Sequence, residues 1–210
     1  MEKIKMQFGS LTLNEEVINR LDELDYTPES LSEVVEAQRN NDDGPRVYVG
    51  TYAKYNAGNI CGLWVNLTDF TYYDDFINFC KAIHADEDEP ELMFQDFDNF
   101  PRKYYSESSL DKVTYDNICE YGNLCEQYEP ETIDYFVENM DHDINDFEEC
   151  YQGRYASEED FAREIVDGCY DLDKIMGSLS CYFDYEAFAR DLFACDYEYD
   201  AATGAVFWRH

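Results

Sequence analysis

Runs of acidic side chains are the feature of this sequence with the most evident chemistry. The stretch ETIDYFVENMDHDINDFEE, from Glu131 to Glu149, holds eight carboxylates in nineteen residues and neither Lys nor Arg. On a helix, Glu131, Asp134, Glu138 and Asp141 would share one face, because their spacing follows the helical period. Four charges would then lie along about 15 Å, a density similar in scale to the phosphates of one DNA strand, about 3.4 Å apart.

A second acidic row is expected downstream, on a helix that Ser157 can cap and that Gly168 could end early. Its members have spacings of four, three and four residues: Asp160, Glu164, Asp167 and Asp171. The acidic surface that the sequence predicts consists of Asp116, Glu120, Glu126, Glu129, Glu131, Asp134, Glu138, Asp141, Asp143, Asp146, Glu148, Glu149, Glu158, Asp160, Glu164, Asp167 and Asp171.

The whole chain is strongly acidic and still able to bury a core. It has 210 residues, 48 acidic and 15 basic side chains, a net charge of −33 and 17% aromatic residues. A disordered acidic tail would be poor in aromatics, so the chain is expected to fold. Such a charge disfavours binding to nucleic acid or anionic membranes and favours a cationic partner or metal ions.

A solvated face that only keeps the protein soluble is the alternative interpretation of the acidic rows. The window from Val113 to Gly153 contains twelve acids and no Lys or Arg, so it forgoes the Glu–Lys pairs that usually support a helix. The repulsion costs on the order of 1 kcal/mol per row, which burial of one Phe or Ile would offset. The pattern therefore favours a functional acidic surface.

Specific metal and cofactor sites find little support in the sequence. The loop that starts at Asp141 resembles a calcium-binding EF-hand loop, but Asp146 stands where Gly is needed and Gln152 where Glu is needed. The histidines, His84, His142 and His210, are isolated, and the eight cysteines form no C-x-x-C pair and are expected to be reduced and mostly buried. No nucleotide or catalytic motif occurs, so we expect neither an enzyme nor a cofactor.

These residues must be positioned by helices and strands, and the sequence patterns predict an α+β protein of several small domains. We expect a helical extension at 1–45, an α+β domain with a β-hairpin at 46–105, a helical domain at 106–150 and an α+β domain at 151–210. In the second domain, RVYVGTYAKYNAGNICGLWVNL predicts an antiparallel hairpin, followed by a helix near 74–85 and a strand in ELMFQDFDNF. Helices are expected at 106–148, at 154–176 and in SCYFDYEAFARDLF, and two short strands around 201–204.

Two segments resemble the ArdA antirestriction family. The first carries a "KYN-x-G" turn and a "G-x-W" strand, with Lys54, Tyr55, Asn56, Gly58, Gly62 and Trp64. The second, LSCYFDYEAFARDL, is similar to the family's antirestriction motif and contains Tyr182, Phe183, Asp184, Tyr185, Glu186, Phe188, Arg190, Asp191 and Leu192. Ala189 stands where we expect Gly in relatives, and the resemblance covers about 46–210, leaving 1–45 as an extension.

The resemblance implies an elongated homodimeric DNA mimic from a mobile genetic element. Such a protein occupies the DNA-binding groove of type I restriction–modification enzymes, on the methyltransferase core with its specificity subunit, and blocks restriction; whether it also blocks modification stays open. The antirestriction motif would lie near the dimer contact, where Arg190 could support the dimer or simply pair with Glu186. No direct nucleic-acid or membrane binding is implied, and the lack of an export signal predicts a cytoplasmic protein.

Three alternatives stay open at this point. The chain could be an acidic mimic aimed at another DNA-binding protein, an acidic protein that binds divalent metals, or a halophilic protein whose acids only retain water. Residues 46–85 carry three acids and three bases, whereas adaptation to salt would spread acids evenly.

Overall fold

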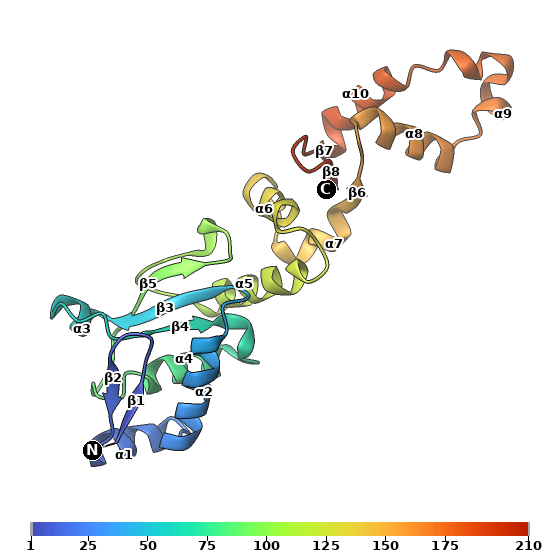
Figure 1. Ribbon diagram of the computed structural model, residues 1–210. Helices are drawn as coiled ribbons and strands as arrows, with labels where there is room; N and C mark the ends of the chain where they lie inside the picture. Colours follow the sequence, from blue (N-terminus) through green and yellow to red (C-terminus); the bar gives the residue numbers. More distant parts are fainter. Residues whose placement is uncertain (1, 210) are drawn as a thin grey trace. The chain divides into compact units, whose positions relative to one another are not determined.

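The computed structural model describes residues 2–209 and divides the chain into two compact units, Met1–Gln127 and Tyr128–His210. Each unit combines helices with a small antiparallel sheet, which confirms the predicted α+β class (Figure 1). The finer division at residues 45, 105 and 150 stays a prediction. No helix within the described residues is long and apolar enough to cross a membrane.

Unit 1 is built around a three-stranded sheet with the order β4-β3-β5. Its strands and α-helices are, in chain order, β1 (Lys3–Lys5), β2 (Ser10–Thr12), α1 (Glu15–Glu23), α2 (Pro28–Asn40), β3 (Arg46–Thr51), α3 (Tyr52–Asn56), β4 (Leu63–Asn66), α4 (Tyr73–Ala82), β5 (Leu92–Asp98) and α5 (Lys112–Cys125).

The predicted hairpin of unit 1 is confirmed as the antiparallel pair β3 and β4, with Val47 opposite Val65. Its connection is more elaborate than a turn, because Thr51 caps the short helix α3 by accepting a hydrogen bond from the Lys54 N–H (3.2 Å). Gly58 follows with a φ of 72°, in the left-handed region that favours glycine. The predicted helix α4 and strand β5 are also confirmed.

Aromatic side chains form much of the core of unit 1. Phe76 of α4 is completely buried and contacts the rings of Phe94 on β5 and Tyr115 on α5. The Tyr115 hydroxyl donates to the backbone oxygens of Leu67 and Phe70. The aromatic content of the sequence is therefore used for packing, and each buried hydroxyl of this kind keeps a partner.

The sequence predicted a purely helical segment for the first 45 residues, but this segment begins with a hairpin. In this hairpin, β1 and β2 pair with Ile4 opposite Leu11, and Gly9 lies in the left-handed region at a φ of 80°. Helix α2 begins at Pro28 with a capping box, in which the Ser30 N–H donates to the Thr27 hydroxyl oxygen and the Thr27 N–H donates to that of Ser30. Each strand has only three residues, too few for an alternating pattern to predict it.

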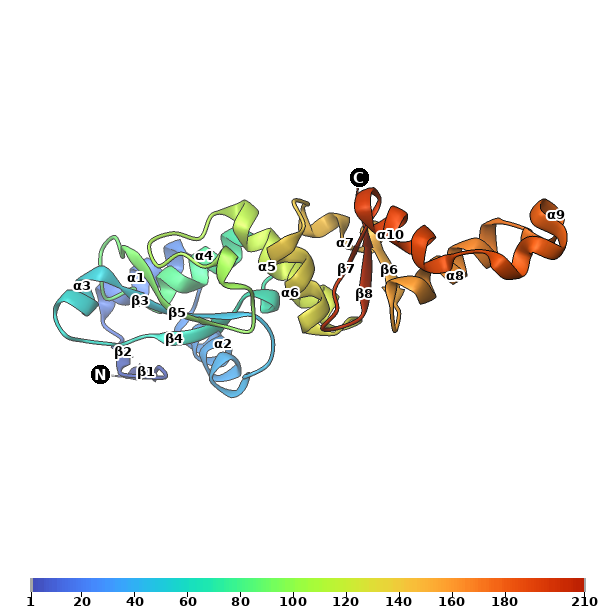
Figure 2. The ribbon, with the colours of Figure 1, turned by 90° about the horizontal axis from the view of Figure 1, so that it is seen from above.

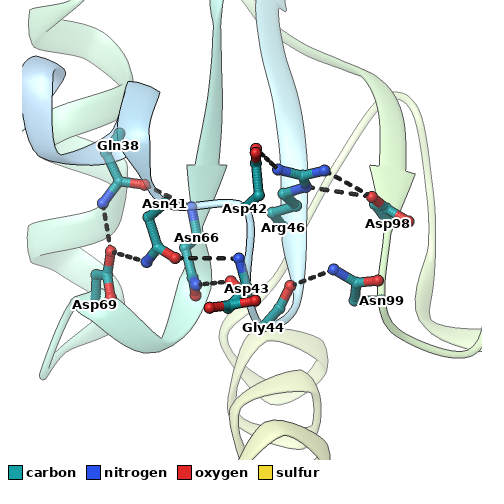
Figure 3. Close-up of polar contacts among 10 residues, drawn as sticks. All are labelled: Gln38, Asn41, Asp42, Asp43, Gly44, Arg46, Asn66, Asp69, Asp98 and Asn99. Atoms are coloured by element: carbon teal, nitrogen blue, oxygen red, sulfur yellow. Dashed lines mark hydrogen bonds and ion pairs between the residues drawn. The ribbon is translucent and has the colours of Figure 1, made fainter.

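Residues 1–45 share the core of unit 1 rather than standing apart from it. Eight of their apolar side chains are buried: Ile4, Met6, Leu11, Leu13, Val17, Leu21, Leu31 and Val35. The buried Gln38 accepts from the Asn66 N–H (2.7 Å) and donates to Asp69 (2.8 Å), which also accepts from Asn41 (Figure 3). These bonds tie the end of α2 to the end of β4.

The segment at 41–45, between α2 and β3, is likewise held in place by hydrogen bonds. Arg46 pairs with Asp42 (2.6 Å) and with Asp98 of β5 (2.9 Å), and Asn99 donates to the carbonyl of Gly44 (Figure 3). Because Asn66 at the end of β4 also donates to the carbonyl of Asp43, the segment between α2 and β3 is held by both edge strands, β4 and β5.

Unit 2 contains a second three-stranded sheet, ordered β6-β8-β7 (Figure 2). Its elements are α6 (Pro130–Asn139), α7 (Phe147–Cys150), β6 (Tyr151–Arg154), α8 (Glu158–Cys169), α9 (Leu172–Met176), α10 (Tyr185–Cys195), β7 (Tyr197–Tyr199) and β8 (Ala205–Trp208). Phe207 at the centre of the sheet is buried against the rings of Phe136 and Phe147.

Two predictions, one for unit 2 and one for the cysteines of the whole chain, need correction. The helix expected at 154–176 is two helices, because Tyr170 is extended and α8 ends at Cys169, one residue after Gly168. Of the eight cysteines, all are free, but only Cys61, Cys80 and Cys150 are buried, so the expectation of mostly buried thiols is wrong. The two short strands at the C-terminal end are confirmed as β7 and β8.

Candidate acidic interaction surface

Helix α6 is amphipathic as the sequence predicts. Its inward side chains are buried: Ile133, Phe136 and Val137, with Met140 just beyond the last turn. On its outward face Glu131 and Glu138 are exposed, and Asp134 between them is half-buried. Burial of the apolar face supplies the stability that lets this helix present carboxylates without basic neighbours.

The fourth residue of this row, Asp141, does not lie on the helix. Helix α6 ends at Asn139, and Met140 adopts an extended backbone with a ψ of 138° while its side chain stays buried. Asp141 therefore follows in a turn, where it is exposed. The prediction of four carboxylates on one helical face is wrong in this respect.

Helix α8 carries the first three members of the second row. The predicted cap is confirmed, since the Ser157 hydroxyl oxygen accepts from the Asp160 N–H (3.1 Å). Asp160, Glu164 and Asp167 are exposed on this helix. Asp171 lies beyond it and instead caps α9, where its carboxylate accepts from the Lys174 N–H (3.0 Å).

Glu164 also affects a neighbouring tyrosine. The Tyr155 hydroxyl donates to Glu164 Oε1 (3.1 Å), and its ring packs edge-on against the buried Phe161. Burial and the adjacent carboxylate together raise the pKa of Tyr155 to about 12. The tyrosine therefore stays protonated and keeps this contact over the whole physiological pH range.

None of the seventeen predicted acids is buried. Three of them are half-buried: Glu120, Asp134 and Asp146. The other fourteen are exposed: Asp116, Glu126, Glu129, Glu131, Glu138, Asp141, Asp143, Glu148, Glu149, Glu158, Asp160, Glu164, Asp167 and Asp171. Asp116, Glu120 and Glu126 belong to unit 1, on and just after α5, and the others to unit 2. Their assignment to a partner-binding surface stays a prediction.

Few basic side chains offset this charge within unit 2. It contains 22 acids and five bases. Arg154 pairs with Glu129 (2.5 Å), Arg163 with Glu159 (2.5 Å), and Arg209 with Glu198. Carboxylates therefore outnumber basic side chains in this unit by more than four to one.

The segment similar to the antirestriction motif leads into α10. Asp184 caps this helix by accepting from the Ala187 N–H (3.0 Å), and Phe183 packs against the rings of Tyr185 and Phe188. The outward side chains Asp184, Glu186, Arg190 and Asp191 are exposed, Leu192 is half-buried, and Tyr182 is 79% exposed.

Arg190 is unusual among the arginines of unit 2. The pairing with Glu186 that the sequence allows is not formed, and within the described residues Arg190 makes no ion pair. A guanidinium that stays unpaired among so many carboxylates is available to a partner.

Sequence reasoning missed a polar cluster in unit 1. His84 was expected to be isolated, but the structure surrounds it with Lys54, Asp86 and Glu87. The available signal was the acidic run that follows His84 directly in the sequence, HADEDE. His210 lies outside the described residues, so the expectation for it is untested.

The contacts of Gly62 and Trp64 explain why these residue types occur in the "G-x-W" segment. A Cβ atom on Gly62 would lie 2.3 Å from the carbonyl oxygen of Val49, so only glycine fits there. Trp64 packs edge-on against Tyr48, and the Arg46 guanidinium lies 5.0 Å from its ring centre. These contacts fix β4 against β3.

The family profile described as "antirestriction protein (ArdA)" matches residues 47–207, most of the chain. The chain belongs to the ArdA family. The match confirms the resemblance drawn from the two sequence segments and leaves 1–46 outside the region shared with the ArdA family. A search of individual curated proteins gave no significant match.

Proposed function

We propose that this ArdA family member acts as a DNA mimic that occupies the DNA-binding groove of type I restriction–modification enzymes. The contact would be made with the methyltransferase core and its specificity subunit, in the cytoplasm, where incoming mobile DNA is restricted. Membership of an antirestriction family and the surplus of exposed carboxylates over bases in unit 2 support this proposal. The mimic needs no catalysis, because occupying the groove is sufficient.

The observation that carries the proposal is that fourteen of the seventeen predicted acids are exposed, in a chain whose unit 2 has 22 acids and five bases. On α6, Glu131 and Glu138 are seven residues apart, which corresponds to about 10 Å along a helix. That distance is about three phosphate intervals along one DNA strand. A groove that has basic side chains at phosphate spacing would find carboxylates at comparable intervals on this helix.

A homodimer built through the segment around α10 is part of the same proposal. Apolar side chains are exposed along the segment between α8 and α10: Tyr170, Ile175, Leu179 and Tyr182, with exposed fractions of 52–79%. Burying such residues against a second copy would stabilise a dimer by the hydrophobic effect. Arg190, unpaired within the described residues, would supply a polar contact to this interface.

Competition against DNA tests the function directly. The purified protein should displace a duplex from a type I methyltransferase core at a ratio near one mimic per DNA site, and displacement should weaken as salt rises. Failure to displace DNA, together with displacement from an unrelated DNA-binding protein, would favour a mimic directed at another target. Failure with both would contradict DNA mimicry.

A further inference from the structure

A buried cation in unit 1 lies at the centre of a set of metal-ligand side chains. The Lys54 side chain is 10% exposed, and its Nζ lies 2.8 Å from His84 Nδ1, 2.7 Å from Asp86 Oδ1 and 3.5 Å from Glu87 Oε1. The lysine is held on α3, whereas the three acceptors follow the end of α4. The ammonium therefore joins two segments about 30 residues apart.

The protonation state of His84 follows from this geometry. An ammonium only donates hydrogen bonds, so His84 Nδ1 accepts and the ring proton is on Nε2, which faces the carbonyl oxygen of Val49 at 3.3 Å. The imidazole is thus neutral in this arrangement, with its Nδ1 lone pair directed at the cation.

A neutral imidazole and two carboxylates are also the ligands of many divalent transition-metal sites. The ligand atoms of His84, Asp86 and Glu87 all lie within 4.8 Å of one another. Zinc bonds of about 2.0–2.2 Å would require them to draw slightly closer than they are around an ammonium. Glu87 is held from a second side, because the Thr51 hydroxyl donates to its Oε1 (2.6 Å).

We propose that His84, Asp86 and Glu87 form a latent site for a divalent transition metal, and that the Lys54 ammonium is its resident cation. The lysine side chain supplies the positive charge that the two carboxylates need, and it excludes a metal by occupying the same space. The cluster explains why Lys54, one of the residues that carry the family resemblance, is buried. The inference is independent of the proposed DNA mimicry.

Removing the ammonium from the full-length chain tests the site. Lys54→Ala should bind one Co²⁺ per chain and give the intense visible absorption of four-coordinate cobalt, which the unsubstituted protein should lack. Zn²⁺ should raise the unfolding temperature of this variant and leave that of the unsubstituted protein unchanged at the same concentration.

Two further variants control for metal bound at surface carboxylates or at free cysteines. Lys54→Ala combined with Asp86→Asn and Glu87→Gln should lose the cobalt absorption, because two of the three ligands are gone. Lys54→Arg should not gain it, because the cation is retained. The inference would be overturned if Lys54→Ala gave no such absorption, if the unsubstituted protein gave it equally, or if the triple variant kept it.

A measurement on the unsubstituted protein covers the case in which Lys54→Ala fails to fold. In trace acetylation at about pH 9, Lys54 should react about tenfold or more slowly than the exposed Lys174, because it becomes accessible only through local opening. Equal rates at Lys54 and Lys174 would show that the ammonium does not reside in the cluster.

Discussion

Neutralising four carboxylates of unit 2 should weaken binding to the restriction enzyme without unfolding the protein. The suitable set is Glu138→Gln, Asp141→Asn, Glu149→Gln and Asp167→Asn, since all four side chains are exposed and make no hydrogen bond or ion pair within the described residues. Because no intramolecular contact is lost and like-charge repulsion is relieved, the unfolding temperature should stay the same or rise slightly.

The expected loss of affinity follows from the free energy that exposed ion pairs contribute to binding. One such pair contributes about 0.2–1 kcal/mol, so four lost pairs cost about 1–4 kcal/mol, or roughly fivefold to a thousandfold in Kd. The loss should shrink as salt is raised, and the plot of log K against log salt concentration should become shallower than for the unsubstituted protein. Displacement of fluorescent duplex from a type I methyltransferase core, titrated at several salt concentrations, measures both quantities.

A matched control separates the position of the charges from the net charge. Glu16→Gln, Asp22→Asn, Glu33→Gln and Glu36→Gln remove the same four charges from exposed positions on α1 and α2, outside the region that matches the family. If the mimic lies in unit 2, this control should lose less affinity. Unchanged affinity of the unit 2 variant, or an equal loss in the control, would refute the assignment of the partner-binding surface.

Three further predictions concern stability, pH and assembly. Gly62→Ala should destabilise the protein by about 1–3 kcal/mol in urea unfolding, because its Cβ would collide with the Val49 carbonyl, whereas Gly168→Ala, which meets open space on α8, should be neutral or stabilising; equal effects would contradict the steric argument. Although burial alone would raise the pKa of Asp200, hydrogen bonds from Thr203 and Ala202 lower it overall, so its contribution to stability should be present above about pH 4 and lost as pH falls through the lowered pKa. Asp200→Asn should flatten that part of the pH–stability curve, and an unaltered curve would exclude this role. Arg190→Ala should shift the protein toward monomer in sedimentation while Lys174→Ala does not, and a dimer that persists in Arg190→Ala would remove Arg190 from the proposed interface.

Elements with a regular pattern of apolar residues could be predicted from the sequence, but the C-terminal ends of some helices could not. The pairing of β3 with β4, the helix α4 and the strand β5 follow from alternating or helical patterns that extend over several residues. Asp141 and Asp171 were misplaced because the helices that precede them end at Asn139 and Cys169. Nothing in the sequence marks the end of α6 at Asn139, whereas Gly168 had indicated that α8 could end before Asp171.

Contacts between distant segments were beyond the reach of pattern analysis. Lys54 and His84 belong to different elements, and nothing in their local sequences indicates that α3 and the end of α4 meet. The hairpin of β1 and β2 was missed for a related reason, since each strand has a single inward side chain, Ile4 and Leu11. In both cases the fold is specified by burial that only the assembled unit provides.

The hydrogen bonds of Gln38 make the extension costly to trim. A chain shortened to begin at residue 46 would leave the N–H of Asn66, which is 4% exposed, without its acceptor and would uncover the apolar surface that Leu31 and Val35 now occupy. Variants meant to isolate the ArdA-like region should therefore keep α2.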